Sequence, residues 1–128
     1  MNPITIEEAM FFNAKPNAAP LYTAFRERLL QRCPSTKIQV KKTQISFINR
    51  HLFAAISFTP VKRAKERPNP FITITFGLDH KLCHPRIAAV VEAYPHRFTH
   101  HMLVGSIEEI DDELLSWLEE AAAFAELK

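Results

Sequence analysis

Two adjacent histidines, His100 and His101, occupy the middle of the segment RFTHHMLV, residues 97–104. Histidine exchanges protons near neutral pH and binds metals, so the pair could form half of a metal site or a catalytic pair. The third alternative is one core histidine beside one surface histidine. The segment predicts a β-strand, in which adjacent side chains point to opposite faces. His100 then shares its face with three apolar side chains, those of Phe98, Met102 and Val104. We therefore expect His100 to be buried and hydrogen-bonded, and His101 to lie on the open face of a sheet.

The segment DHKLCH contains a second set of candidate ligands, His80, Cys83 and His84. On a helix their spacing would place all three on one side, where imidazole and thiolate suit a soft metal such as zinc. The segment has no helical apolar pattern and ends at Pro85, so we interpret it as a solvated loop and keep zinc as the alternative. A thiolate of Cys83 beside His84 is a further alternative, but adjacency in sequence does not supply the geometry of a catalytic pair. The prediction is therefore no metal and no cofactor.

The composition excludes several classes of protein. Only two glycines occur among 128 residues, so a glycine-rich loop that cradles phosphate is absent from the sequence. The two cysteines, Cys33 and Cys83, form no CxxC pair, and no long apolar run occurs. These features predict a reduced cytoplasmic protein without a membrane span. The length suits one domain that spans residues 1–128.

Charge is distributed unevenly along the chain. Between residues 37 and 67, eight basic residues stand against the single acid Glu66, and from residue 107 onward eight acids stand against Lys128 alone. This asymmetry indicates either an anionic partner or two solvated faces of one domain.

Two helices are predicted before residue 34. Thr5 and Glu8 have the spacing of a capping box, which predicts a short helix after Thr5. A second helix is predicted over about residues 20–32, with Arg26 off its apolar stripe. That stripe consists of residues spaced by four, namely Leu21, Phe25 and Leu29.

A series of strands follows the helices. Alternating or β-rich segments predict strands at residues 37–41, 44–48, 52–59, 71–76 and 97–104. Residues 88–94 fit either a strand or a helix, and we favour a strand. The basic stretch 60–70, with proline at both ends, predicts an exposed loop.

A last helix closes the predicted fold. Ser106 and Glu109 form a second capping box, which we expect to open this helix. Its predicted buried stripe is Ile110, Leu114, Trp117, Leu118, Ala121 and Ala125. The order of elements predicts an α+β protein of two layers. One layer is an antiparallel sheet of about five strands, and the N-terminal helices and a long C-terminal helix pack on one face of it.

The face of the sheet without helices collects short hydroxyl and basic side chains. We select six of these positions as candidate ligand-binding residues: Lys41, Lys42, Thr73, Thr75, Arg97 and His101. Hydroxyls beside cations suit an anionic or polar ligand. The alternative is the ordinary outer face of a one-sided sheet, because threonine has a high β propensity.

Three stretches together resemble a bacterial family of small domains of unknown function, DUF5655. They are FFNAKPNAAPLYTAFRERL, VKKTQISFINRHLFAAI and RFTHHMLVGSIEEIDDELLSWLEEA. The resemblance covers most of the chain, whereas the loop 61–69 and the DHKLCHPR segment match least. It implies a compact α+β domain, found alone or fused to others, with no assigned activity. The matching positions are Lys42, Thr43, Gln44, His100 and His101.

These observations favour a binding or accessory module over an enzyme. The expected ligand is anionic: a small molecule, a nucleic acid or an acidic protein segment bound at the open face. One alternative is an enzyme that uses His101 as acid or base, with Lys42 or Arg97 stabilising negative charge. Another is a homo-oligomeric interaction domain, so that the chain is a monomer or a homodimer.

Overall fold

A six-stranded antiparallel sheet forms one layer of the structure, a computed structural model that describes residues 3–127. Its strands are β1 (Lys37–Val40), β2 (Gln44–Ile48), β3 (Leu52–Ser57), β4 (Ile72–Leu78), β5 (Ala89–Tyr94) and β6 (Arg97–Val104). Their order across the sheet is β1-β2-β3-β4-β6-β5, which leaves β1 and β5 at the edges. The sheet has six strands where about five were expected, and residues 89–94 form a strand, the alternative that was favoured over a helix.

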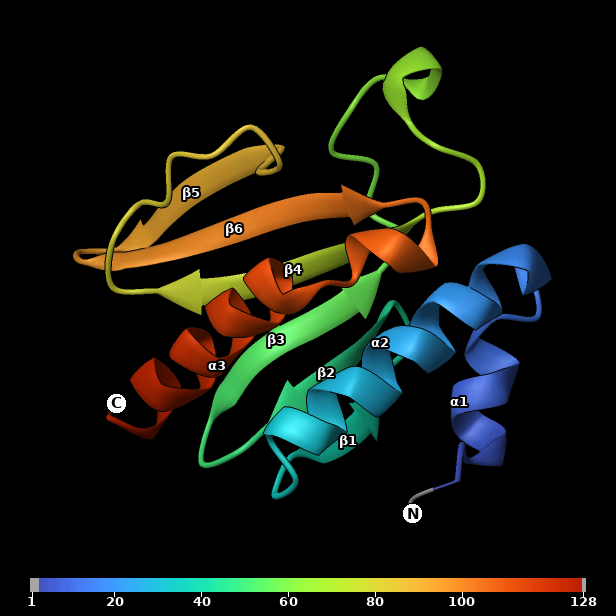
Figure 1. The fold of residues 1–128 in the computed structure, drawn as a ribbon, viewed down its shortest axis with the longest axis horizontal. Helices are drawn as coiled ribbons and strands as arrows, with labels where there is room; N and C mark the ends of the chain where they lie inside the picture. The colour runs from blue at the N-terminus through green and yellow to red at the C-terminus, as the bar shows by residue number, and fades with distance from the viewer. Residues whose placement is uncertain (1–2, 128) are drawn as a thin grey trace.

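Helices cover one face of this sheet and form the second layer (Figure 1). They are α1 (Ile6–Phe11), α2 (Ala19–Arg32) and α3 (Asp112–Glu126), with short 3-10 helices at η1 (Pro16–Ala18), η2 (Ala64–Glu66) and η3 (Ile107–Glu109). The predicted α+β arrangement, with helices from both ends of the chain on one face, is confirmed. Among the helices described, none combines the length and the apolar character that a membrane crossing requires.

Local sequence signals explain where the helices begin. At α1 the Thr5 side chain accepts a hydrogen bond from the Glu8 N–H, and the Glu8 carboxylate accepts one from the Thr5 N–H. The second capping box forms as predicted, but it opens η3 and not α3. The chain leaves that turn at the buried Ile110, and α3 begins two residues later at Asp112, with Asp111 as its N-cap.

The core lies between the helices and the sheet. In β4 the side chains of Ile72, Ile74, Phe76 and Leu78 are buried on the helix side, as strand alternation requires. All six residues of the predicted α3 stripe and all three of the α2 stripe are buried. Arg26 is the exception to the prediction: it lies off the apolar stripe but is only 7% exposed.

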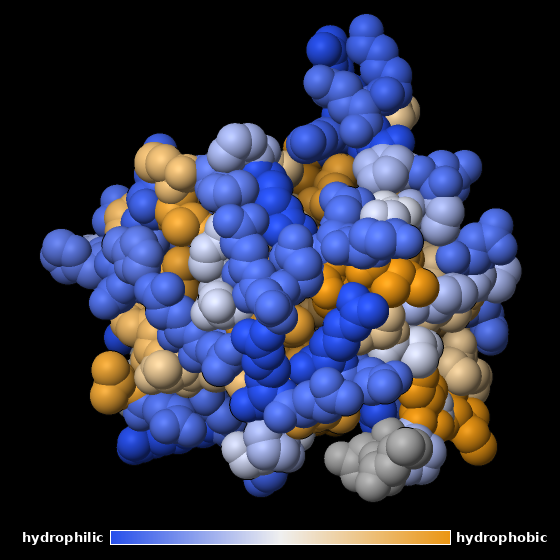
Figure 2. Space-filling model, viewed as in Figure 1, coloured by the Kyte–Doolittle hydropathy of each residue, from blue (hydrophilic) through white to orange (hydrophobic). Residues whose placement is uncertain are grey.

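The loop from residue 60 to residue 70 projects from one end of the sheet (Figure 1). Figure 2 shows that its surface is mainly hydrophilic, which agrees with the predicted exposed loop. The loop leaves the end of β3 and returns at the start of β4. It therefore lies at the same end of the sheet as the β1–β2 turn, because Gln44 pairs with Ser57 and Ser57 pairs with Thr73.

Candidate functional site

His100 belongs to the core, as strand alternation predicts. Its ring is fully buried and stacks on Phe76, with ring centroids 5.1 Å apart and planes inclined by 8°. The backbone N–H of Leu82 donates a hydrogen bond of 2.9 Å to its Nε2 atom. Burial lowers the pKa of His100, although the backbone carbonyls of Phe76 and Phe98 act in the opposite direction. The imidazole is therefore a neutral acceptor that attaches the segment after β4 to the sheet.

His101 lies on the opposite, helix-free face and is half-buried. It pairs with Thr75 across β4 and β6, and its Nδ1 atom is hydrogen-bonded to Thr75 Oγ1 at 2.9 Å. Burial lowers the pKa of His101, so the ring is neutral at neutral pH. Within residues 3–127 its Nε2 atom has no hydrogen-bond partner. That nitrogen is the polar atom at this position that remains available to a ligand.

The neighbouring hydroxyl groups are occupied by bonds within the protein. Thr73 Oγ1 donates to the backbone oxygen of Thr59 at 2.7 Å, and Ser57 Oγ donates to Thr59 Oγ1 at 3.1 Å. Thr73 is fully buried and Ser57 nearly so, although none of the helices between residues 3 and 127 covers this face. These side chains thus form a closely packed floor beside His101. Their hydroxyls also attach Thr59, the residue before the loop 60–70, to β3 and β4.

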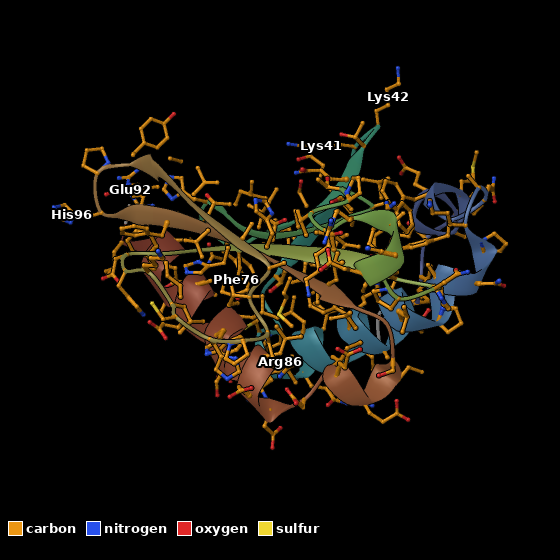
Figure 3. The ribbon with its side chains drawn as sticks, turned by 90° about the horizontal axis from the view of Figure 1, so that it is seen from above. Lys41, Lys42, Phe76, Arg86, Glu92 and His96 are labelled. Carbon is orange, nitrogen blue, oxygen red and sulfur yellow. The ribbon has the colours of Figure 1, made fainter. Side chains whose placement is uncertain are left out.

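The predicted cations lie in two separate places. Lys41 and Lys42 lie in the turn after β1, at the loop end of the sheet, where the Lys41 N–H donates to the Gln44 carbonyl. Figure 3 shows the Lys41 side chain extending over the open face and Lys42 extending away from the body of the molecule. Arg97 begins β6 at the other end of the sheet, next to the β5–β6 turn. The structure therefore groups Thr73, Thr75 and His101 on the open face, places Lys41 at the end of the sheet nearest Thr73, and leaves Arg97 at the opposite end.

Two arginines form ion pairs with four of the eight acids in the C-terminal segment. Arg86 contacts Asp111 at 2.9 Å and Glu113 at 3.0 Å. Arg32 contacts two further acids of α3, Asp112 and Glu119. In the basic segment 37–67, by contrast, the ion pair within the described chain is Arg63 with Glu66 at 3.3 Å. The positive charge of this segment is therefore largely uncompensated.

The candidate zinc ligands are not brought together. His80 contacts Asp79 at 2.7 Å and Glu120 at 3.4 Å, whereas His84 contacts Glu113 at 3.2 Å. Cys83 is a free, exposed thiol. In the part of the chain that is described, the donor group that could hold an ion is Asp79, His80 and Glu120, all exposed. The prediction missed this set because its acid from α3 is distant in sequence.

Two basic residues near the loop were also missed. The Lys15 ammonium lies 5.3 Å from the ring centroid of Phe58 and 5.6 Å from that of Phe71. The Arg67 guanidinium lies 6.0 Å from the Phe71 ring. Arg67 was visible as part of the basic stretch. Lys15, between Asn13 and Pro16, carries no sequence signal that distinguishes it from a solvated lysine.

Gly105 supports the base of the loop. A Cβ atom at this position would lie 2.4 Å from the Cβ and 2.7 Å from the Cγ of Pro68, so the loop packs against the bare backbone after β6. A proline ring cannot rotate out of the way as a long side chain can. The loop base is therefore fixed by this close approach.

Gly105→Ala is expected to destabilise the protein by about 1–3 kcal/mol, because the added methyl must displace Pro68. Urea unfolding measures this loss. The matched control is Gly77→Ala, where the nearest atom to the new methyl would be the Phe98 backbone oxygen at 3.9 Å. That variant should be as stable as the wild type or slightly more stable. Equal losses in the two variants would contradict the proposed packing role of Gly105.

Comparison with known proteins identifies a family. The model of a domain of unknown function, DUF5655, matches residues 7–125. No curated protein and no solved structure matches the chain.

Proposed function

The chain belongs to the DUF5655 family, and from this premise we propose that it is a non-catalytic binding module for an anionic partner. The proposed surface is the loop end of the open sheet face, from Lys41 and the floor around His101 to the loop 60–70. The observation that carries the proposal is the positive charge at this end, where Lys41, Lys42, Lys62, Lys65 and Arg67 form no ion pair within residues 3–127. An anion that binds there replaces water and counterions without breaking an internal ion pair.

The chemistry of the floor supports binding. His101 offers the Nε2 atom of a neutral ring held by Thr75, and the nearby Ser57 and Thr73 hydroxyls are already satisfied. A neutral imidazole can donate or accept one hydrogen bond and adds no charge of its own. Long-range attraction is then supplied by the surrounding lysines and arginines, and His101 supplies a short-range contact.

The geometry favours binding over catalysis. An acid–base histidine needs a group nearby that stabilises the developing negative charge. Lys42 extends away from the sheet, and Arg97 lies four residues before His101, at the start of β6. Neither of the two proposed electrostatic partners lies beside the His101 ring.

The test is fluorescence anisotropy with a labelled oligothymidylate and a labelled oligoglutamate peptide. Oligothymidylate binding should weaken steeply with salt, and Lys41→Gln should reduce the slope of log K against log salt by about one. The matched control is Lys37→Gln, which removes a lysine at the opposite end of β1 and should leave that slope nearly unchanged.

Each possible outcome decides a part of the proposal. Binding of oligoglutamate alone would identify an acidic protein segment as the partner class. A salt-independent affinity, or equal effects of Lys41→Gln and Lys37→Gln, would refute an electrostatic site at the loop end. Turnover of a bound ligand that disappears in His101→Ala would instead favour an enzyme.

A further inference from the structure

A cavity of about 420 Å³ lies between residues 14–18 and residues 64–71, outside the floor around His101. Its walls come from the segment that ends in η1 and from the base of the projecting loop, which lie at the same end of the molecule (Figure 1). Its lining includes the side chains of Lys15, Asn17, Arg67, Asn69 and Phe71. The lining includes no aspartate or glutamate.

Two cations converge on one aromatic ring in this cavity. Lys15 and Arg67 lie 5.6 Å and 6.0 Å from the Phe71 centroid. Neither forms an ion pair within residues 3–127. A cation–π contact positions a charge but does not neutralise it, since the ring has no net charge. Two positive charges thus face the same pocket, whose lining contributes no anionic side chain.

We propose that this cavity binds a phosphate monoester, with the phosphate held between Lys15 and Arg67. A phosphate monoester carries nearly two negative charges at neutral pH and so matches the two cations. The planar guanidinium of arginine suits two phosphate oxygens, and the lysine acts as a point charge. The inference goes beyond the proposed function, because it concerns a separate cavity and a small ligand.

The remaining walls suit the organic part of such a ligand. Phe71 presents an aromatic surface, and the amides of Asn17 and Asn69 can donate hydrogen bonds. The volume lies at the small end of the range for ligand pockets and fits a metabolite, not a polymer. The approach of Pro68 to Gly105 fixes the wall that carries Arg67, so the cavity does not depend on a freely moving loop.

The test is an NMR titration of ¹⁵N-labelled protein with phenyl phosphate, a phosphate monoester with one aromatic ring. We expect saturable shifts of amides in residues 14–18 and 64–71. Inorganic phosphate should bind more weakly at the same amides, and phenol should not bind. Lys15→Gln and Arg67→Gln should each weaken phenyl phosphate binding by about tenfold, because each removes one charged hydrogen-bond partner.

Lys65→Gln is the matched control, because Lys65 belongs to the same loop but does not line the cavity. It should leave the affinity within about twofold. Lys15 is exposed and outside the core, so Lys15→Gln tests the site even where Arg67→Gln disturbs the loop. Absence of saturable shifts, or equal affinities of Lys15→Gln and the wild type, would overturn the inference.

Shifts centred on Thr75 and His101 would also overturn it, because they would place the phosphate on the open face. Oligothymidylate binding by the same variants separates the two proposals. Lys15→Gln should bind phenyl phosphate about tenfold more weakly. In the oligothymidylate assay, Lys41→Gln should still reduce the salt slope when Lys15→Gln is also present. A negative phenyl phosphate titration therefore does not contradict the proposed function. A negative oligothymidylate assay likewise does not contradict phosphate binding in the cavity.

Discussion

Replacing Glu8 by alanine should lower the free energy of unfolding by about 3–5 kcal/mol, the largest loss expected from any single substitution proposed for this protein. The Glu8 carboxylate is only 1% exposed. It accepts hydrogen bonds from the Tyr22 hydroxyl and from Arg26 Nε, the latter at 2.7 Å, and it also completes the α1 capping box with Thr5. Alanine would leave a buried guanidinium without this carboxylate and a buried hydroxyl without its acceptor.

The same cluster predicts how the effect depends on pH. Burial raises the pKa of Glu8, but hydrogen bonds from the Thr5 backbone, Tyr22 and Arg26 outweigh burial and hold the pKa below its ordinary value of 4.5. A carboxyl group with a lowered folded pKa stabilises the protein above its unfolded pKa, and this contribution is lost as the pH falls below that value. Glu8→Gln removes the charge, so its stability should depend less on pH below about 4.5 than that of the wild type.

Glu7→Ala is the matched control for Glu8→Ala. Glu7 precedes Glu8 in the first turn of α1 but is exposed, so its loss should change the unfolding free energy by less than about 0.5 kcal/mol. Urea unfolding at neutral pH measures both variants. Similar stabilities of the Glu8 and Glu7 variants would show that the buried cluster does not hold α1 against α2.

The parts of the fold that could be predicted are those governed by neighbouring residues. Strand alternation assigned His100 and His101 to opposite faces, because that property depends only on local backbone geometry. The Thr5 capping box was predictable for the same reason. The second box, at Ser106, marked a helical start correctly but not the start of α3, because the burial of Ile110 ends that turn. Tertiary packing therefore overrode a local signal.

The parts that could not be predicted depend on residues far apart in sequence. The second role of Glu8 required α2 to place Tyr22 and Arg26 beside it. Their spacing of four residues on one helical face was the available signal. Lys15 and Arg67 meet at Phe71 only because the loop folds back towards η1. The uneven distribution of charge could be read from the sequence. The ion pairs of Arg32 and Arg86 show that arginines from elsewhere in the chain partly compensate the acidic C-terminal segment.

His100→Phe should cost about 1–3 kcal/mol near neutral pH and should also flatten the dependence of stability on pH below 6.5. A phenyl ring keeps the stacking on Phe76 but offers no acceptor to the Leu82 N–H, which explains the loss. The second effect follows from the lowered pKa of His100. On acidification the unfolded chain binds the proton first, so the wild type loses stability as the pH falls below 6.5.

The comparison with the wild type isolates this contribution. A single buried histidine contributes at most about 1.4 kcal/mol per pH unit, and the phenylalanine variant lacks it. His101, whose pKa is also lowered by burial, contributes in the same direction to both proteins. Stability curves from urea unfolding at about pH 7.5 and about pH 5.5 should therefore converge as the pH falls. Their convergence measures the His100 contribution alone.

His96→Asn separates this effect from a general loss of one histidine. His96 is exposed in the β5–β6 turn with a φ of 63°, and asparagine tolerates that left-handed conformation. Its stability at about pH 7.5 should lie within about 0.5 kcal/mol of the wild type, because the side chain is exposed. If the His100→Phe curve ran parallel to that of the wild type, His100 would bind its proton equally well in the folded and unfolded chains. That result would refute a pKa of His100 lowered by burial. It would also refute the assignment of His100 as a neutral ring that accepts a hydrogen bond from the Leu82 N–H.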